Sequence, residues 1–82
     1  MQRMRIPSRV KLPFGYEIKV KIFPKTKLLE VDPDPADGLW DVNTRTIYIS
    51  KSLTHTEQIG ILSHEMLHAM ADWNLWVARG RR

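Results

Sequence analysis

The sequence contains no cysteine, which excludes disulfide bonds and thiolate metal sites. It also has no apolar run close to the ~20 residues that a membrane-spanning helix requires. The N-terminal residues 1–5 are basic, but no apolar segment of the kind found in signal peptides follows them. We therefore expect a cytoplasmic protein in which histidine and carboxylate side chains are the protein ligands available to a metal ion.

The 82 residues suffice for one domain, 1–82, that buries a little over ~60% of its unfolded surface. A hydrophobic content of 43% and a charged content of 27% are typical of a globular chain. The net charge of +4 is unevenly spread, because residues 1–30 carry eight Lys or Arg and two acids, whereas residues 31–78 carry two and seven. The basic part is a candidate surface for nucleic acid or an acidic partner, and a solvated strand face is the simpler explanation.

Alternating apolar and charged residues over residues 16–22 predict a β-strand with one buried face. Residues 27–31 predict a second short strand, after which a turn-rich acidic segment follows. Residues 39–41 and 46–49 predict the two arms of a hairpin. Together these patterns predict a sheet of three or four antiparallel strands.

Thr54 and Glu57 have the S/T-x-x-E spacing of a capping box, which predicts the start of a long helix. The side of this helix expected to face the core is formed by the apolar residues Ile59, Leu62, Met66, Ala69, Met70, Trp73 and Val77. The helix either ends near Asn74 or continues to a stop at Gly80. The expected fold class is α+β, with a small antiparallel sheet of three or four strands packed on one long C-terminal helix.

The predicted helix contains the motif His-Glu-x-x-His, formed by His64, Glu65 and His68. At about 100° per residue the two histidines lie about 40° apart and one turn from each other, so both imidazoles can bind one metal ion. Glu65 lies about 60° round from His68, where its carboxylate can take a proton from a water at the metal. Because hydrolytic zinc sites use this arrangement, the spacing predicts His64 and His68 as zinc ligands and Glu65 as the general base.

The sequence around these three residues resembles the active-site helix of the HExxH zinc metallopeptidases, the zincins. With the strand predicted just before the helix, it is similar to the small cytoplasmic and phage-borne ImmA/IrrE-like and minigluzincin-type members. The resemblance implies a sheet above the helix whose edge strand pairs with an extended peptide substrate. That edge would be the arm over residues 46–49 or its neighbour.

The chain departs from the gluzincins at the third metal ligand, which in those enzymes is a Glu from a helix well downstream. Only fourteen residues follow His68, and none of them is Glu. Asp72 resembles the third-ligand position of families that read HExxHxxxD, although thermolysin-like enzymes carry an Asp there that is not a ligand. The resemblance therefore leaves Asp72, water or another subunit to complete the site.

The expected function is zinc-dependent hydrolysis of peptide bonds in a peptide or protein substrate, in the host cytoplasm if the chain is phage-encoded. One alternative is a non-catalytic zinc-binding regulatory or virion-associated relative, but such a protein has no use for a base at Glu65. A second alternative is a basic module that binds nucleic acid or a protein partner. Nucleic acid is disfavoured, because basic and aromatic residues do not interleave on one predicted surface.

Overall fold

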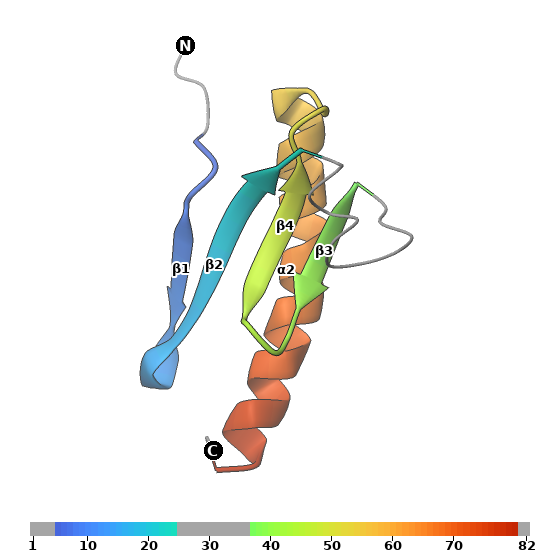
Figure 1. The fold of residues 1–82 in the computed structure, drawn as a ribbon. Coiled ribbons are helices and arrows are strands. Elements are labelled where there is room, and N and C mark those ends of the chain that lie inside the picture. Colours follow the sequence, from blue (N-terminus) through green and yellow to red (C-terminus); the bar gives the residue numbers. More distant parts are fainter. Residues whose placement is uncertain (1–4, 25–36, 81–82) are drawn as a thin grey trace.

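Four β-strands form one sheet, and one long helix covers a face of it (Figure 1). The computed structural model describes residues 5–24 and 37–80. The elements in chain order are β1 (Arg9–Leu12), the 3-10 helix η1 (Pro13–Gly15), β2 (Tyr16–Phe23), β3 (Gly38–Asp41), β4 (Thr46–Ser50) and α2 (His55–Ala78). The expected α+β class, with one long C-terminal helix on a small sheet, is confirmed.

The sheet is mixed, with the strand order β1-β2-β4-β3. β1 pairs antiparallel with β2, and β3 pairs antiparallel with β4, but β2 and β4 run parallel with Val20 opposite Ile47. The expectation of a wholly antiparallel sheet was wrong for this central pair. The chain first runs back along β3, and β4, which is antiparallel to β3, therefore has the same direction as β2. The strand expected over residues 27–31 and most of the acidic segment after it lie outside the described residues.

The core lies between the sheet and α2. Its strand residues, all at most 7% exposed, are Tyr16, Ile18, Val20, Ile47 and Ile49. β4 is buried along its whole length, because it lies between β2 and β3. On its outer face Tyr48 packs against Phe23, with ring centroids 5.2 Å apart. This central strand therefore gives α2 a fixed surface on which to pack.

The capping box predicted at the start of α2 is confirmed. Thr54 Oγ1 accepts a hydrogen bond from the Glu57 N–H at 3.2 Å, and Glu57 Oε1 accepts one from the Thr54 N–H at 2.9 Å. The helix continues without a break past Asn74 and ends before Gly80, whose φ of 86° suits a glycine after a helix. No helix in the described ranges is long and apolar enough to span a membrane.

The predicted apolar side of α2 is confirmed only in part, with Ala69 buried and Leu62, Met66 and Trp73 packed against the core, and the centre of the buried side lies elsewhere. Its buried residues are Gln58, Glu65 and Ala69, and the apolar residues that pack beside them include Ile61 and Trp76. This side is rotated by about 70° from the predicted apolar line, at 100° per residue. The centre was misplaced because the prediction counted apolar residues alone, whereas two of the three fully buried positions are polar. Gln58 is accommodated because its Nε2 donates to the Ser50 carbonyl oxygen at 3.2 Å.

Candidate metal centre

His64 and His68 lie one turn apart on an exposed part of α2. Their ring centroids are 5.1 Å apart, and the ring planes meet at 81°. Zn–N bonds of about 2.0–2.1 Å at a tetrahedral ion bring two imidazole centroids to roughly 5 Å from each other. The pair therefore fits two positions of a zinc site.

Glu65 lies on the sheet side of the helix and is only 9% exposed. Gly38, the first residue of β3, lies directly beside it, because a Cβ at Gly38 would be 3.6 Å from Glu65 Cγ and would clash with the Ile61 side chain. No described residue hydrogen-bonds to the Glu65 carboxylate or forms an ion pair with it. Glu65 thus lies on the side of α2 that faces β3, and its carboxylate has no partner from residues 5–24 or 37–80.

Asp72 lies one turn beyond His68 and has a different neighbour. Its Oδ2 accepts a hydrogen bond from Trp40 Nε1 at 2.6 Å, which joins α2 to β3. Within the described ranges no three His, Asp or Glu side chains form a group that could hold a metal ion. The structure therefore brings the two histidines together but does not bring Asp72 to them, and the straight course of α2 past Asn74 gives no bend that would do so.

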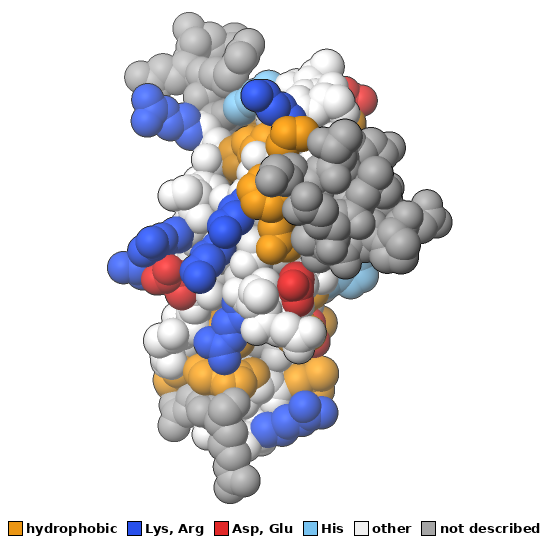
Figure 2. Space-filling view, viewed as in Figure 1, with side chains coloured by type: hydrophobic (Ala, Val, Ile, Leu, Met, Phe, Trp, Pro, Cys, Tyr) orange, Lys and Arg blue, Asp and Glu red, His pale blue; other side chains and the backbone are white. Residues whose placement is uncertain are grey.

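β3 forms an edge of the sheet as far as the structure describes it, and β4 lies in the centre. Histidine surface appears at the margin of the sheet on the side of β3 (Figure 2). Of the two arms that the resemblance to zincins offered for substrate pairing, residues 46–49 are thus already paired on both sides. β3 is the arm with a side left for a peptide within the described strands.

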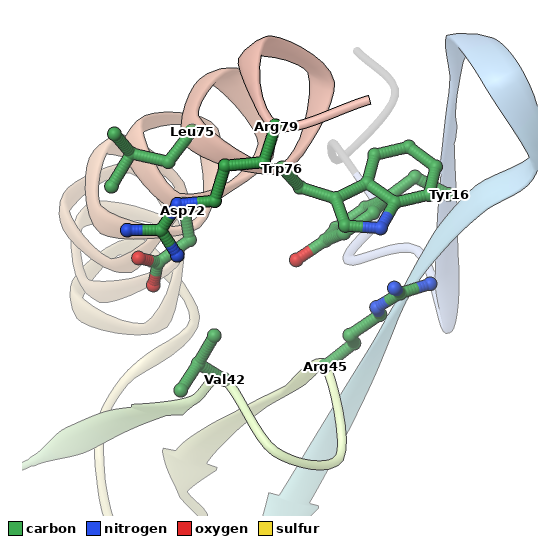
Figure 3. A pocket seen from close by; sticks show the side chains of 7 residues that line it. All are labelled: Tyr16, Val42, Arg45, Asp72, Leu75, Trp76 and Arg79. Atoms are coloured by element: carbon green, nitrogen blue, oxygen red, sulfur yellow. The ribbon is translucent and has the colours of Figure 1, made fainter. Parts of the chain in front are cut away.

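A hollow of about 580 Å³ lies beyond the motif, between the C-terminal part of α2 and the β3–β4 turn (Figure 3). It is lined by Tyr16, Val42, Arg45, Asp72, Leu75, Trp76 and Arg79. Burial raises the pKa of the Tyr16 hydroxyl above its usual 10.0, the Arg45 guanidinium counteracts this rise, and the Asp72 carboxylate adds to it. The hollow could not be predicted from sequence, because its residues come from three separate parts of the chain.

Comparison with known proteins adds no relative: no protein-family model, curated protein or solved structure matches the chain. Inference about function therefore starts from the residues of the site.

Proposed function

We propose that this protein is a zinc-dependent peptidase in which His64 and His68 hold the ion and Glu65 is the general base. The observation that carries the proposal is the 5.1 Å separation of the two imidazole rings on an exposed helix turn, with Glu65 next to them in the chain. A cytoplasmic location, that of a host if the gene belongs to a phage, is part of the proposal.

His64 and His68 would hold the zinc ion, and Glu65 would transfer a proton. When bound, zinc supplies Lewis acidity, which polarises a carbonyl group and makes a water more acidic. Glu65 removes a proton from that water while the water oxygen attacks the carbonyl carbon of the peptide. Glu65 then delivers the proton to the amide nitrogen as the C–N bond breaks, so the products are a carboxylic acid and an amine.

β3 is the proposed pairing surface for the substrate. An extended peptide that adds to the side of β3 left unpaired by the described strands would form main-chain hydrogen bonds with it, as in other cases of β-augmentation. Glu65 lies beside Gly38 at the start of this strand. A peptide bond paired there would be close to the candidate base.

The main alternative is a zinc-binding protein without hydrolytic activity. The position of Glu65 favours the peptidase, because this carboxylate lies beside His64 in the chain and forms no hydrogen bond or ion pair with a described residue.

The test compares Glu65→Gln with the parent chain, in protein freed of metal and reloaded with zinc. We expect the variant to bind about one zinc per chain while losing peptide hydrolysis, because an amide cannot accept the proton. Cleavage is followed by mass spectrometry on a peptide mixture, and zinc by atomic absorption. Glu17→Gln, on the outer face of β2, is the control and should keep both properties. Hydrolysis by Glu65→Gln at the parent rate would exclude Glu65 as the base.

The metal ligands are tested by His64→Ala, with His55→Ala as the matched control. His55 is the first residue of the same helix, two turns or more from the motif. We expect the His64 variant to lose zinc and the His55 variant to retain it. Equal zinc content in the two variants would overturn the assignment.

A further inference from the structure

The geometry points to the hollow beyond the motif as a binding site for an acidic side chain of the peptide substrate, N-terminal to the bond that is cleaved. This inference rests on the proposed peptidase function and names a feature of its substrate. It starts from the charges of the hollow. Two guanidinium groups, of Arg45 and Arg79, line it together with one carboxylate, that of Asp72.

Neither guanidinium group forms an ion pair with a residue that the structure describes. No carboxylate oxygen of residues 5–24 or 37–80 lies within 4.0 Å of the Arg45 or Arg79 nitrogens. The Asp72 carboxylate is itself held by Trp40 through Oδ2. The hollow thus has a net positive charge and N–H donors that an incoming carboxylate can use.

Arg45 is held in place before any ligand arrives. Its guanidinium carbon lies 4.0 Å from the centroid of the Tyr16 ring and 5.1 Å from that of Trp76. Its backbone φ of 53° is in the left-handed region, which non-glycine residues rarely adopt, and such strained positions concentrate at functional sites. A cation fixed by two aromatic rings loses little freedom when it binds an anion.

Arg79 complements this fixed group from the other wall. It is exposed, and its side chain extends over the hollow toward Asp72 (Figure 3). Val42 and Leu75 add apolar surface to the lining of the hollow. A carboxylate on a short aliphatic stem, as in Glu, matches this combination of charge and surface.

The direction of β3 decides on which side of the cleaved bond this residue lies. Gly38 lies beside Glu65, and Trp40 forms a hydrogen bond with Asp72, so β3 runs in the same direction as α2. A peptide that pairs antiparallel with β3, the more stable pairing, runs the opposite way. Its N-terminal part therefore lies over the C-terminal half of α2, where the hollow is.

The distance along the peptide follows from helix geometry. Asp72 and Trp76 lie four and eight residues beyond His68, which is about 6 and 12 Å along the helix at 1.5 Å per residue. An extended peptide covers about 3.3 Å per residue. The acidic residue should therefore precede the cleaved bond by about two to four residues.

Binding is measured with the full chain carrying Glu65→Gln, so that peptides are not cut. The probes are acetylated and amidated ten-residue peptides in which a single Glu is moved along an uncharged sequence, each paired with its Gln counterpart. We expect the Glu peptide to bind ~10-fold more tightly at its best position, as a charge-assisted contact implies, and tryptophan fluorescence reports the affinity.

The variant that tests the site is Arg79→Gln, because Arg79 is exposed and the fold does not depend on it. It should abolish the preference for Glu over Gln. Arg9→Gln is the control, since Arg9 is also exposed but lies on β1 and pairs with Glu17. Arg9→Gln should leave the preference intact. A preference that survives Arg79→Gln, or that Arg9→Gln removes equally, overturns the assignment.

The remaining outcomes separate this inference from the proposed function. If the Glu65→Gln protein binds Glu and Gln peptides equally, or binds neither, while the parent protein holds zinc and cleaves peptides, the carboxylate site is refuted and the peptidase stands. A Glu preference abolished by Arg79→Gln in protein that neither holds zinc nor cleaves would keep the carboxylate site and refute the peptidase. If a Gln peptide with a free C-terminal carboxylate binds as tightly as the Glu peptide, the hollow binds the C-terminal carboxylate of a peptide and not an acidic side chain, which would overturn the inference. Cleavage of parent substrates before the Glu, instead of two to four residues after it, would refute the orientation.

Discussion

The Asp72 carboxylate connects two elements at the border between the motif and the hollow. Its hydrogen bond to Trp40 Nε1, at 2.6 Å, ties the C-terminal half of α2 to β3. This hydrogen bond orients β3 beside the candidate metal centre, and Asp72 also lines the hollow. Asp72 is therefore better suited to positioning than to zinc ligation.

This role predicts that Asp72→Ala lowers stability more than zinc affinity. The unpaired Trp40 N–H should cost about 1–3 kcal/mol in the free energy of unfolding. The zinc dissociation constant should rise by less than ~10-fold, whereas loss of a direct ligand costs orders of magnitude. A chelator competition titration measures the affinity, with His68→Ala as the reference for a lost ligand. Comparable losses in the two variants would make Asp72 the third ligand.

The residues of the motif could be predicted from sequence because their relation is local. The spacing of His64 and His68 on a helix fixes one turn between them, and the structure has their rings 5.1 Å apart. The partner of Asp72 could not be predicted, because Trp40 lies 32 residues away in the chain. Arg45 likewise gave no signal, since its contacts are with rings from β2 and α2.

At the scale of elements, the start of α2 shows how a local signal becomes a pH effect. Two hydrogen bonds from Thr54 lower the pKa of the Glu57 carboxyl below its usual 4.5, and the bond from the backbone N–H has a larger effect than the bond from the side chain. The unfolded chain therefore takes up this proton before the folded one does as the pH falls. The stabilisation is present above pH 4.5 and is lost as the pH falls through the pKa of the folded state.

We therefore expect Glu57→Ala to melt at a lower temperature than the parent chain at pH 7, and the difference to shrink as the pH is lowered below about 4.5. Thermal unfolding followed by circular dichroism across this range measures it. Thr54→Ala keeps the backbone N–H that donates to Glu57, so it should be less stable than the parent chain at pH 7 and yet retain part of the pH dependence. A difference between parent and Glu57→Ala that stays constant down to pH 3 would contradict the mechanism.

The contact of β3 with α2 depends on a glycine. A Cβ on Gly38 would overlap the Ile61 side chain and lie 3.1 Å from the Tyr48 carbonyl oxygen. We expect Gly38→Ala to destabilise the fold by about 1–3 kcal/mol, as overpacking does, by pushing the strand away from the helix. Gly60→Ala is the control: nothing lies within 4 Å of its added Cβ, so it should stabilise α2 by about 0.5–1 kcal/mol. Urea unfolding midpoints that move in the same direction in both variants would contradict this account.

The strands over residues 16–22, 39–41 and 46–49, the hairpin and the capping box could be predicted from the sequence, but the centre of the buried side of α2 could not. Gln58 and Glu65 occupy buried positions because one has a carbonyl partner and the other lies at the candidate site. Hydrophobic periodicity assigns such positions to the surface. The parallel pairing of β2 with β4 was also missed, since strand order depends on contacts between distant segments.

At the scale of the whole molecule, a ligand that binds only the folded state raises the free energy of unfolding of a small domain by a measurable amount. Zinc at 100 times its dissociation constant should add about 2.7 kcal/mol to the free energy of unfolding. For a domain of this size, that corresponds to a rise of about 10–20 °C in melting temperature. Differential scanning fluorimetry with and without zinc measures the rise, and magnesium serves as the control ion. An equal rise in His64→Ala would locate the stabilising zinc elsewhere.

The order of the elements along the chain has a consequence for synthesis on the ribosome. The apolar inner face of the sheet belongs to β2 and β4, and α2, which covers that face in the described structure, follows all four strands. A nascent chain emerging from the N-terminus therefore contains the complete sheet before it contains the cover. Until the helix has left the exit tunnel, Ile18, Val20, Ile47 and Ile49 lack the described element that covers them, and an apolar face exposed in this way favours aggregation or chaperone binding.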